Sequence, residues 1–200
     1  MPASHRARLQ ALASQLVAQP TATLSAAAKR RRANQARFNG EAPSSDTADD
    51  SDDQPLKGLL VVEMAMVIAA PQACALMADM GARVVKVEPP GGEMWRKNGM
   101  PASGLDRRGE TFTVGFESIN RGKESIVLDM KEPTHMEALK RLLAKADAFV
   151  TNLRQPALES QGLDYNTLKK EFPALVYAHF TAWGRQGPKK DDPGYNLYQN

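Results

Sequence analysis

The pattern of apolar and polar positions changes near residue 55. From Leu56 onward, short apolar or β-branched runs alternate with segments whose apolar positions recur at helical spacing. The pattern predicts strands at 59–63, 83–88, 125–129, 148–152 and 175–181, and helices at 71–80, 133–145, 157–161 and 165–171. Strands interleaved with helices predict an α/β fold with a Rossmann-like parallel sheet.

Residues that commonly begin or end helices support these boundaries. Pro71 suits the first turn of a helix because its missing N–H would be unpaired there in any residue. Gly81 suits the C′ position that ends this helix, and Asp164 suits the N-cap of a later one. Two strands separated by a helix cannot form a tight hairpin, so residues 59–88 are expected to form a βαβ unit with a right-handed crossover.

The first 54 residues have a different composition. Seven basic and no acidic residues lie in the first 40 positions, and six acidic and no basic residues lie in 41–53. These segments are poor in aromatic residues and predict a disordered tail over 1–54, which leaves 55–200 as the folded domain. Three interpretations of the tail stay open: an organelle transit peptide, an inert tail, or a nuclear or nucleic-acid signal at 29–32. The expected location is mitochondrial or cytoplasmic.

Charge and hydropathy exclude several classes of protein for residues 55–200. Residues 55–200 hold 19 basic and 17 acidic side chains, which gives no basic excess for binding nucleic acid. The chain has no run of 18 apolar residues, so no membrane span is expected. Cys74 is the single cysteine, which excludes an internal disulfide, and its apolar helical context predicts a buried structural thiol.

The three histidines are scattered and have no metal-ligand spacing with acids or with Cys74, so no metal site is expected. His135 is expected to face solvent on a helix, and His179 is expected in a strand, both in structural roles.

The position of a ligand site follows from the sheet, because dinucleotide and P-loop fingerprints are missing from the sequence. In an open parallel sheet, ligands bind outside the carboxyl ends of the strands. The segments that follow those ends are 67–71, 88–93, 152–156 and 182–187. A helix that begins near Pro71 would present free N–H groups there, and Gly91 and Gly92 would let backbone approach a ligand. These residues indicate a phosphate- or nucleotide-bearing ligand.

Three stretches resemble one known family. They read LKGLLVVEMAMVIAAPQACALMADMGARVVKVEPPGGEMWR, INRGKESIVLDMKEP, and ADAFVTNLRQPALESQGLDYNTLKKEFPALVYAHFTAWGRQGP followed by KKDDPGYN. Over 55–200 they are similar, in order and spacing, to the family III CoA transferases and the related acyl-CoA racemases. The resemblance implies the N-terminal part of that family's fold and an interlocked homodimer when full length. It implies a coenzyme A thioester and a carboxylic acid as substrates, with no separate cofactor.

The resemblance also assigns positions to parts of the CoA thioester. It places Val67, Ile68 and Ala69 on the loop that lines the thioester site. It places Glu88 and Pro89 at the adenosine end, Arg121 and Lys123 near the phosphates, and Asn152 and Leu153 beside the pantetheine arm.

The reaction implied by the resemblance passes through a covalent intermediate on an aspartate. That aspartate would follow the segment Gly194-Tyr195-Asn196, so the 200-residue chain is expected to be incomplete, to lack the catalytic carboxylate and to be inactive alone. The alternatives are a non-catalytic truncated relative that binds CoA or a partner subunit, and a racemase. Tyr195 counts against the racemase, because racemases of this family carry a histidine there.

The acid specificity implied by the resemblance rests on a few positions. Formyl-CoA transferases carry Gln at the position of Ile68, so oxalate or formate specificity is not expected. The sequence looks most like the transferases that act on hydroxy- or aryl-carboxylic acids.

Overall fold

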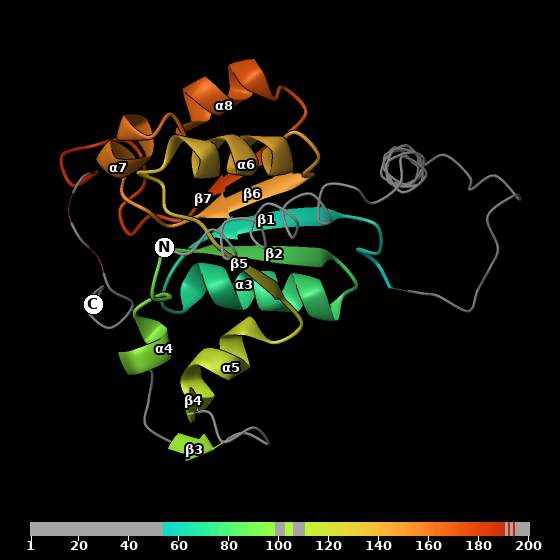
Figure 1. Cartoon of the computed structure of the whole chain (residues 1–200). Coiled ribbons are helices and arrows are strands. Elements are labelled where there is room, and N and C mark those ends of the chain that lie inside the picture. Colours follow the sequence, from blue (N-terminus) through green and yellow to red (C-terminus); the bar gives the residue numbers. More distant parts are fainter. Residues whose placement is uncertain (1–53, 99–102, 106–110, 191, 193, 195–200) are drawn as a thin grey trace, which may run out of the picture.

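The computed structural model describes residues 54–98, 103–105, 111–190, 192 and 194. Its main sheet has five parallel strands in the order β5-β2-β1-β6-β7 (Figure 1). The strands are β1 (Leu60–Met64), β2 (Arg83–Glu88), β5 (Glu124–Val127), β6 (Ala148–Thr151) and β7 (Val176–His179). The predicted α/β fold with a parallel sheet is confirmed.

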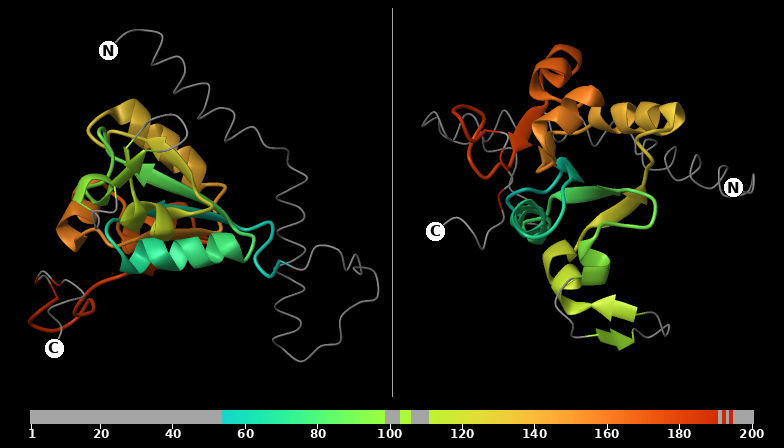
Figure 2. Two further views of the ribbon diagram at one scale, coloured as in Figure 1. Left: turned by 90° about the horizontal axis from the view of Figure 1, so that it is seen from below. Right: turned by 90° about the vertical axis from the view of Figure 1, so that its left-hand side faces the viewer.

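Helices cover both faces of this sheet (Figures 1 and 2). One face carries α3 (Ala69–Asp79), with α5 (Val114–Asn120) beside it. The other face carries α6 (Pro133–Leu143), α7 (Gln155–Ser160) and α8 (Tyr165–Glu171).

The core has two layers because β1 is buried on both faces. Val62 packs toward α6 with Phe149, in a cluster that includes Leu139. Its neighbour Val61 packs toward α3, in a cluster that includes Cys74. Successive strand residues point to opposite faces, so a strand covered on both sides needs the nearly continuous apolar run seen at 59–62. The prediction that Cys74 is buried is confirmed.

The strand order reverses direction beside β1. The chain runs outward from β1 through β2 to β5, and then returns to place β6 on the other side of β1. The helix after β1 lies on one face, and the helices after β6 lie on the other (Figure 1). Such a reversal opens a crevice at the carboxyl ends of the two strands, where open α/β sheets bind ligands.

The predicted helix ends are largely confirmed. Gly81 has φ +93°, and Ala82 N donates to the Met77 carbonyl over 3.0 Å, which forms the expected C-terminal cap of α3. Asp164 accepts from two backbone N–H groups at the start of α8, as predicted. Helix α3 begins two residues before the predicted Pro71, because Ile68 takes the N-cap position and its carbonyl accepts from Gln72 N.

Sequence periodicity missed the segment between β2 and β5. It contains α4 (Trp95–Asn98), the antiparallel pair β3 (Ser103–Leu105) and β4 (Thr111–Thr113), and α5. These elements are too short for a clear period. The expectation that His135 faces solvent is wrong: the side chain is half-buried, and its Nδ1 accepts from Asp129 N over 3.0 Å. His179 lies in a strand, as predicted.

The tail predicted at 1–54 lies outside the described residues except for Gln54. Among the helices that the structure describes, none has the length and apolar character needed to cross a membrane.

Candidate functional site

The loop from β1 to α3 follows the carboxyl end of β1, next to β6, where the strand order reverses. Within it, Val67 has φ +67°, in the left-handed region that β-branched residues rarely adopt. Such a conformation costs on the order of 1–3 kcal/mol and persists where the surroundings determine it. The next residue, Ile68, leaves 39% of its surface exposed. An apolar side chain is therefore presented beside a strained backbone position.

Side chains at the end of β6 and just after it bond the end of β1 and this loop. Thr151 Oγ1 donates to the Met64 carbonyl over 2.8 Å. Asn152 Oδ1 accepts from Met66 N over 2.9 Å, and Asn152 Nδ2 donates to the Met66 carbonyl over 2.7 Å. Hydrogen bonds from side chains to backbone therefore link the end of β6 to the end of β1 and to the loop that follows it.

Behind the loop lies a buried cluster of alternating charges. Lys86 Nζ contacts Glu63 Oε1 at 2.7 Å and Glu93 Oε2 at 2.9 Å, and it donates to the Ala65 carbonyl at 2.9 Å. Lys123 Nζ contacts Glu63 Oε2 at 2.7 Å. The two ammonium groups and two carboxylates are formally neutral together, so the cluster avoids an uncompensated buried charge.

Burial sets the protonation tendencies of this cluster. It raises the pKa of the Glu93 carboxyl, against the opposing pull of the Lys86 ammonium. It lowers the pKa of Lys123, against the attraction of Glu63. It also raises the pKa of the Cys74 thiol to about 12, with Glu63 adding to the effect. Cys74 is therefore held as an unreactive thiol.

Lys123 is turned inward. Besides Glu63, its ammonium contacts the Pro71 carbonyl and Asn120 Oδ1, each at 2.8 Å. Two of the three N–H donors of the ammonium are used by these oxygens, and its charge is paired with Glu63. This geometry favours a structural role for Lys123, which ties the turn before β5 to the start of α3.

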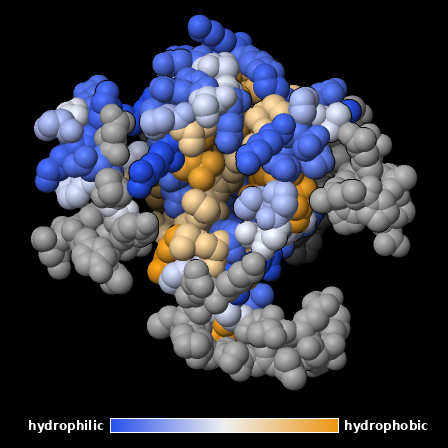
Figure 3. All heavy atoms as spheres, turned by 60° about the vertical axis from the view of Figure 1, so that its left-hand side comes forward, coloured by the Kyte–Doolittle hydropathy of each residue, from blue (hydrophilic) through white to orange (hydrophobic). Residues whose placement is uncertain are grey.

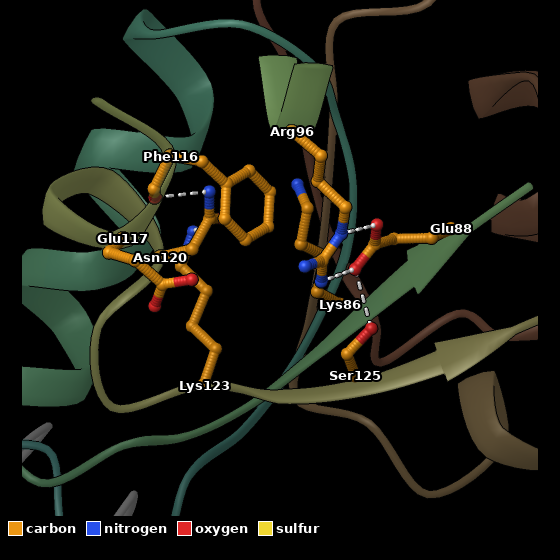
Figure 4. Close-up of a pocket in the computed structure, with 8 residues that line it drawn as sticks. All are labelled: Lys86, Glu88, Arg96, Phe116, Glu117, Asn120, Lys123 and Ser125. Atoms are coloured by element: carbon orange, nitrogen blue, oxygen red, sulfur yellow. Dashed lines mark hydrogen bonds and ion pairs between the residues drawn. The ribbon is translucent and has the colours of Figure 1, made fainter. Parts of the chain in front are cut away.

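A small pocket of about 130 Å³ opens between β2, β5 and α5 (Figure 4). Arg96 lies between the Phe116 ring, 3.9 Å from its centroid, and the buried Glu88 carboxylate. Its Nε and Nη2 reach Glu88 at 2.6 and 2.7 Å, and Ser125 Oγ donates to the same carboxylate. The pocket's cations, Lys86, Arg96 and Lys123, all hold carboxylates of the protein.

The Glu88 carboxyl is held ionised by these contacts. Burial would raise its pKa, but the bonds from Arg96, Ser125 and the backbone N–H of Glu93 outweigh burial and lower the pKa to about 2. Gly92 is required by the same packing, because a Cβ there would lie 2.7 Å from Arg96 Cδ and its φ is +78°.

The residues assigned to the CoA site fall into separate groups. Val67, Ile68 and Ala69 come together with Asn152 and Leu153 at the β1–β6 crevice. Glu88 ends β2, and Pro89 follows it on the exposed surface.

Arg121 lies elsewhere. It pairs with Asp79 at the far end of α3, about 16 Å along the helix from Ile68. The structure does not bring it together with the loop. The roles assigned to all nine residues stay predictions.

The face at the strands' carboxyl ends carries exposed apolar side chains. Ile68, Met94, Phe180 and Trp183 each follow the carboxyl end of a strand and leave 38–49% of their surface exposed. The space-filling view toward this side shows a band of hydrophobic surface flanked by hydrophilic residues (Figure 3). An apolar surface at a sheet's ligand edge suits a ligand with an uncharged arm or acyl group.

Sequence reasoning missed three members of the buried charge cluster, namely Glu63, Lys86 and Glu93, and also missed the partly exposed Arg96. A signal was present for two of them. Glu63 and Lys86 are charged residues inside strands whose apolar runs predicted burial on both faces. Charges in such strands must find partners, and neighbouring parallel strands offer them.

The fold and the site define a class: a doubly covered parallel sheet with its candidate ligand edge at the β1–β6 reversal. Comparison with known proteins names the family. The model of CoA-transferase family III matches residues 56–199. This chain belongs to CoA-transferase family III, as the sequence motifs predicted.

Individual relatives of this chain agree with this family assignment. The chain is 42% identical over 139 residues to the cinnamoyl-CoA:phenyllactate CoA-transferase of Clostridium sporogenes, which covers 70% of this chain and 33% of that protein. It is 41% identical over 145 residues to the succinate–glutarate CoA-transferase of Agrobacterium fabrum, covering 71% and 36%. The chain therefore spans about a third of the length of these curated relatives.

A solved structure shares the fold. A CAIB/BAIF family protein from Brucella suis superposes with a TM-score of 0.68 at 39% identity, over 72% of this chain and 38% of that one.

Proposed function

We propose that this chain forms the CoA-thioester-binding part of a CoA transferase, which moves CoA from an acyl-CoA to a carboxylic acid. The observation that carries the proposal is the β1–α3 loop, where the strained Val67 and the exposed Ile68 stand at the β1–β6 crevice. Membership of CoA-transferase family III supports the coenzyme, and the apolar edge supports an uncharged pantetheine or acyl group.

The proposed chemistry uses a carboxylate nucleophile. An aspartate attacks the donor thioester carbonyl and expels CoA thiolate, which leaves a mixed anhydride. The thiolate then attacks the enzyme's carbonyl, releases the donor acid and leaves an enzyme–CoA thioester. The acceptor carboxylate and the thiolate repeat the two steps in reverse order, so the aspartate is restored without water or ATP. We assign this aspartate to none of the residues of this chain.

The apolar side chains at this edge of the sheet also bear on which class of carboxylic acid is the substrate. Relatives named for phenyllactate and for (R)-2-hydroxy-4-methylpentanoate are 42% and 37% identical to this chain. Ile68 offers no hydrogen bond to an acyl group, whereas a small polar acid such as oxalate would lose hydration beside it. We therefore propose hydroxy- or aryl-carboxylic acids as substrates. The assembly proposed for the whole protein is a homodimer.

Calorimetric titration of the chain with acetyl-CoA tests the proposal. We expect saturable binding that weakens at least about tenfold in Ile68→Glu, because a carboxylate beside the thioester would lose hydration against the uncharged acyl and pantetheine groups. Leu76→Glu is the matched control. Leu76 is also an exposed apolar residue on α3, at 48%, but lies two turns from the loop. Absence of any binding by the unmodified chain would overturn the proposed function.

A further inference from the structure

The loop between β1 and α3 is held by side chains from three different parts of the chain. Lys86 of β2 bonds the Ala65 carbonyl, and Lys123, before β5, bonds the Pro71 carbonyl. Asn152, just after β6, bonds both the N–H and the carbonyl of Met66. Lys86 thus holds the start of the loop, Asn152 holds its middle, and Lys123 holds the first turn of the helix that follows it.

The two bonds from Asn152 act on the strained dihedral angle. The φ angle of Val67 is a rotation about its N–Cα bond relative to the carbonyl carbon of Met66. Asn152 Nδ2 holds that carbonyl at 2.7 Å, and Oδ1 holds Met66 N at 2.9 Å. The peptide plane on one side of the φ +67° rotation is therefore fixed. Strain of this kind relaxes when the surroundings no longer determine it.

The conformation of Val67 in turn affects the exposed residues that follow it. Because Ile68 follows Val67 directly and caps α3, the Val67 conformation decides where the Ile68 side chain and the first turn of α3 face. Relaxation of Val67 toward a negative φ would redirect both.

We propose that Asn152 is a positioning residue. It sets the conformation of the loop that receives the thioester, and it acts through Met66. This inference rests on the proposed function, since it specifies how the same site is preorganised. This role differs from a direct contact with the pantetheine arm, because the hydrogen bonds of the Asn152 amide described above go to the protein backbone.

The first test compares Asn152→Ala with Asp147→Ala. Asp147 is the matched control: its Oδ2 accepts from Leu60 N at 2.7 Å, so it joins the same two strands at the opposite end of the sheet. In Asn152→Ala we expect amide hydrogen exchange of residues 66–70 to quicken at least about tenfold, as expected for two lost hydrogen bonds, and acetyl-CoA affinity to fall by a similar factor. Asp147→Ala should change neither by more than about twofold beyond any global loss of stability.

Asn152→Asp gives a conservative rescue. A protonated carboxyl can donate to the Met66 carbonyl and accept from Met66 N, as the amide does, whereas a carboxylate can only accept. As pH falls from about 8 to about 3, below the ordinary aspartate pKa of about 3.9, exchange at residues 66–70 in this variant should approach that of the unmodified chain measured at the same pH. A lost packing contact alone would not produce this convergence.

The outcomes separate the two proposals. Unchanged exchange at 66–70 in Asn152→Ala, or quickened exchange with unchanged acetyl-CoA affinity, overturns the positioning role. Failure of the unmodified chain to bind acetyl-CoA overturns the proposed function, and the exchange data then still decide whether Asn152 sets the loop conformation.

Discussion

Glu63 of β1 and Lys86 of β2 are direct cross-strand partners whose buried side chains form an ion pair, with Oε1 and Nζ 2.7 Å apart. Their side chains are 0% and 1% exposed. The pair stands immediately behind the β1–α3 loop, because Lys86 also bonds the Ala65 carbonyl. The same charge cluster therefore stabilises the sheet and anchors the proposed ligand loop.

Removing the cation should be costly. Lys86→Met keeps the apolar stem but leaves Glu63 and Glu93 without this partner in the interior, and breaking a buried pair costs about 3–5 kcal/mol. We expect the urea midpoint of unfolding to fall accordingly. Lys131→Met, at an exposed position, should change the free energy of unfolding by less than about 0.5 kcal/mol. Equal effects of the two substitutions would contradict the importance of the buried pair.

The lowered pKa of the Glu88 carboxyl predicts how the stability of the folded chain changes at acid pH. This pKa is lowered to about 2 in the folded chain, from an ordinary value of 4.5. A lowered carboxyl pKa contributes stability that is present above about pH 4.5 and is lost as pH falls toward about 2. In Glu88→Gln, the melting temperature should be lower at neutral pH and should fall less steeply over this interval. Parallel melting curves for the two proteins down to about pH 2 would refute the assignment.

The left-handed conformation of Val67 predicts that glycine can replace this residue with little loss of stability. Val67→Gly relieves a left-handed conformation that costs about 1–3 kcal/mol, which offsets the lost side-chain contacts and the added chain entropy. We expect the free energy of unfolding to stay within about 1 kcal/mol of the unmodified chain. Val61→Gly, at a buried position in β1, should cost roughly 3 kcal/mol or more. A comparable loss in both variants, measured by urea unfolding, would show that Val67 is not strained.

Cys74 should be chemically silent in the folded protein. It is buried, and its pKa is raised to about 12, so almost no thiolate exists near neutral pH. We expect no reaction with a disulfide reagent such as DTNB under native conditions and complete reaction in denaturant. Rapid native-state labelling would mean that α3 opens or that the thiol is exposed.

Much of the fold was predictable because it depends on local patterns. The run at 59–62 predicted a doubly covered strand, Gly81 marked the end of α3, and Asp164 marked the start of α8. Each signal acts within a few residues, through burial periodicity or capping of free backbone groups. The segment between β2 and β5 was missed because its short elements depend on contacts such as Arg96 with Phe116.

The sequence predicted where a ligand site would lie, but not how the residues there are held together. The sequence indicated the loop after β1 and the residues after β6, because ligands bind where parallel strands end. It did not reveal that Asn152 bonds Met66 or that Lys123 reaches Pro71, contacts that join residues 86 and 52 positions apart.

The sequence alone determined the alternation of strands and helices and the identity of the family motifs, since these follow from local periodicity and chain order. It also predicted at which end of the sheet a ligand would bind. Tertiary structure alone decided the strand order that opens the β1–β6 crevice, the pairing of Glu63 with Lys86 and Lys123, and the left-handed Val67. These depend on which distant side chains meet in the low-dielectric interior, and local sequence does not encode that meeting.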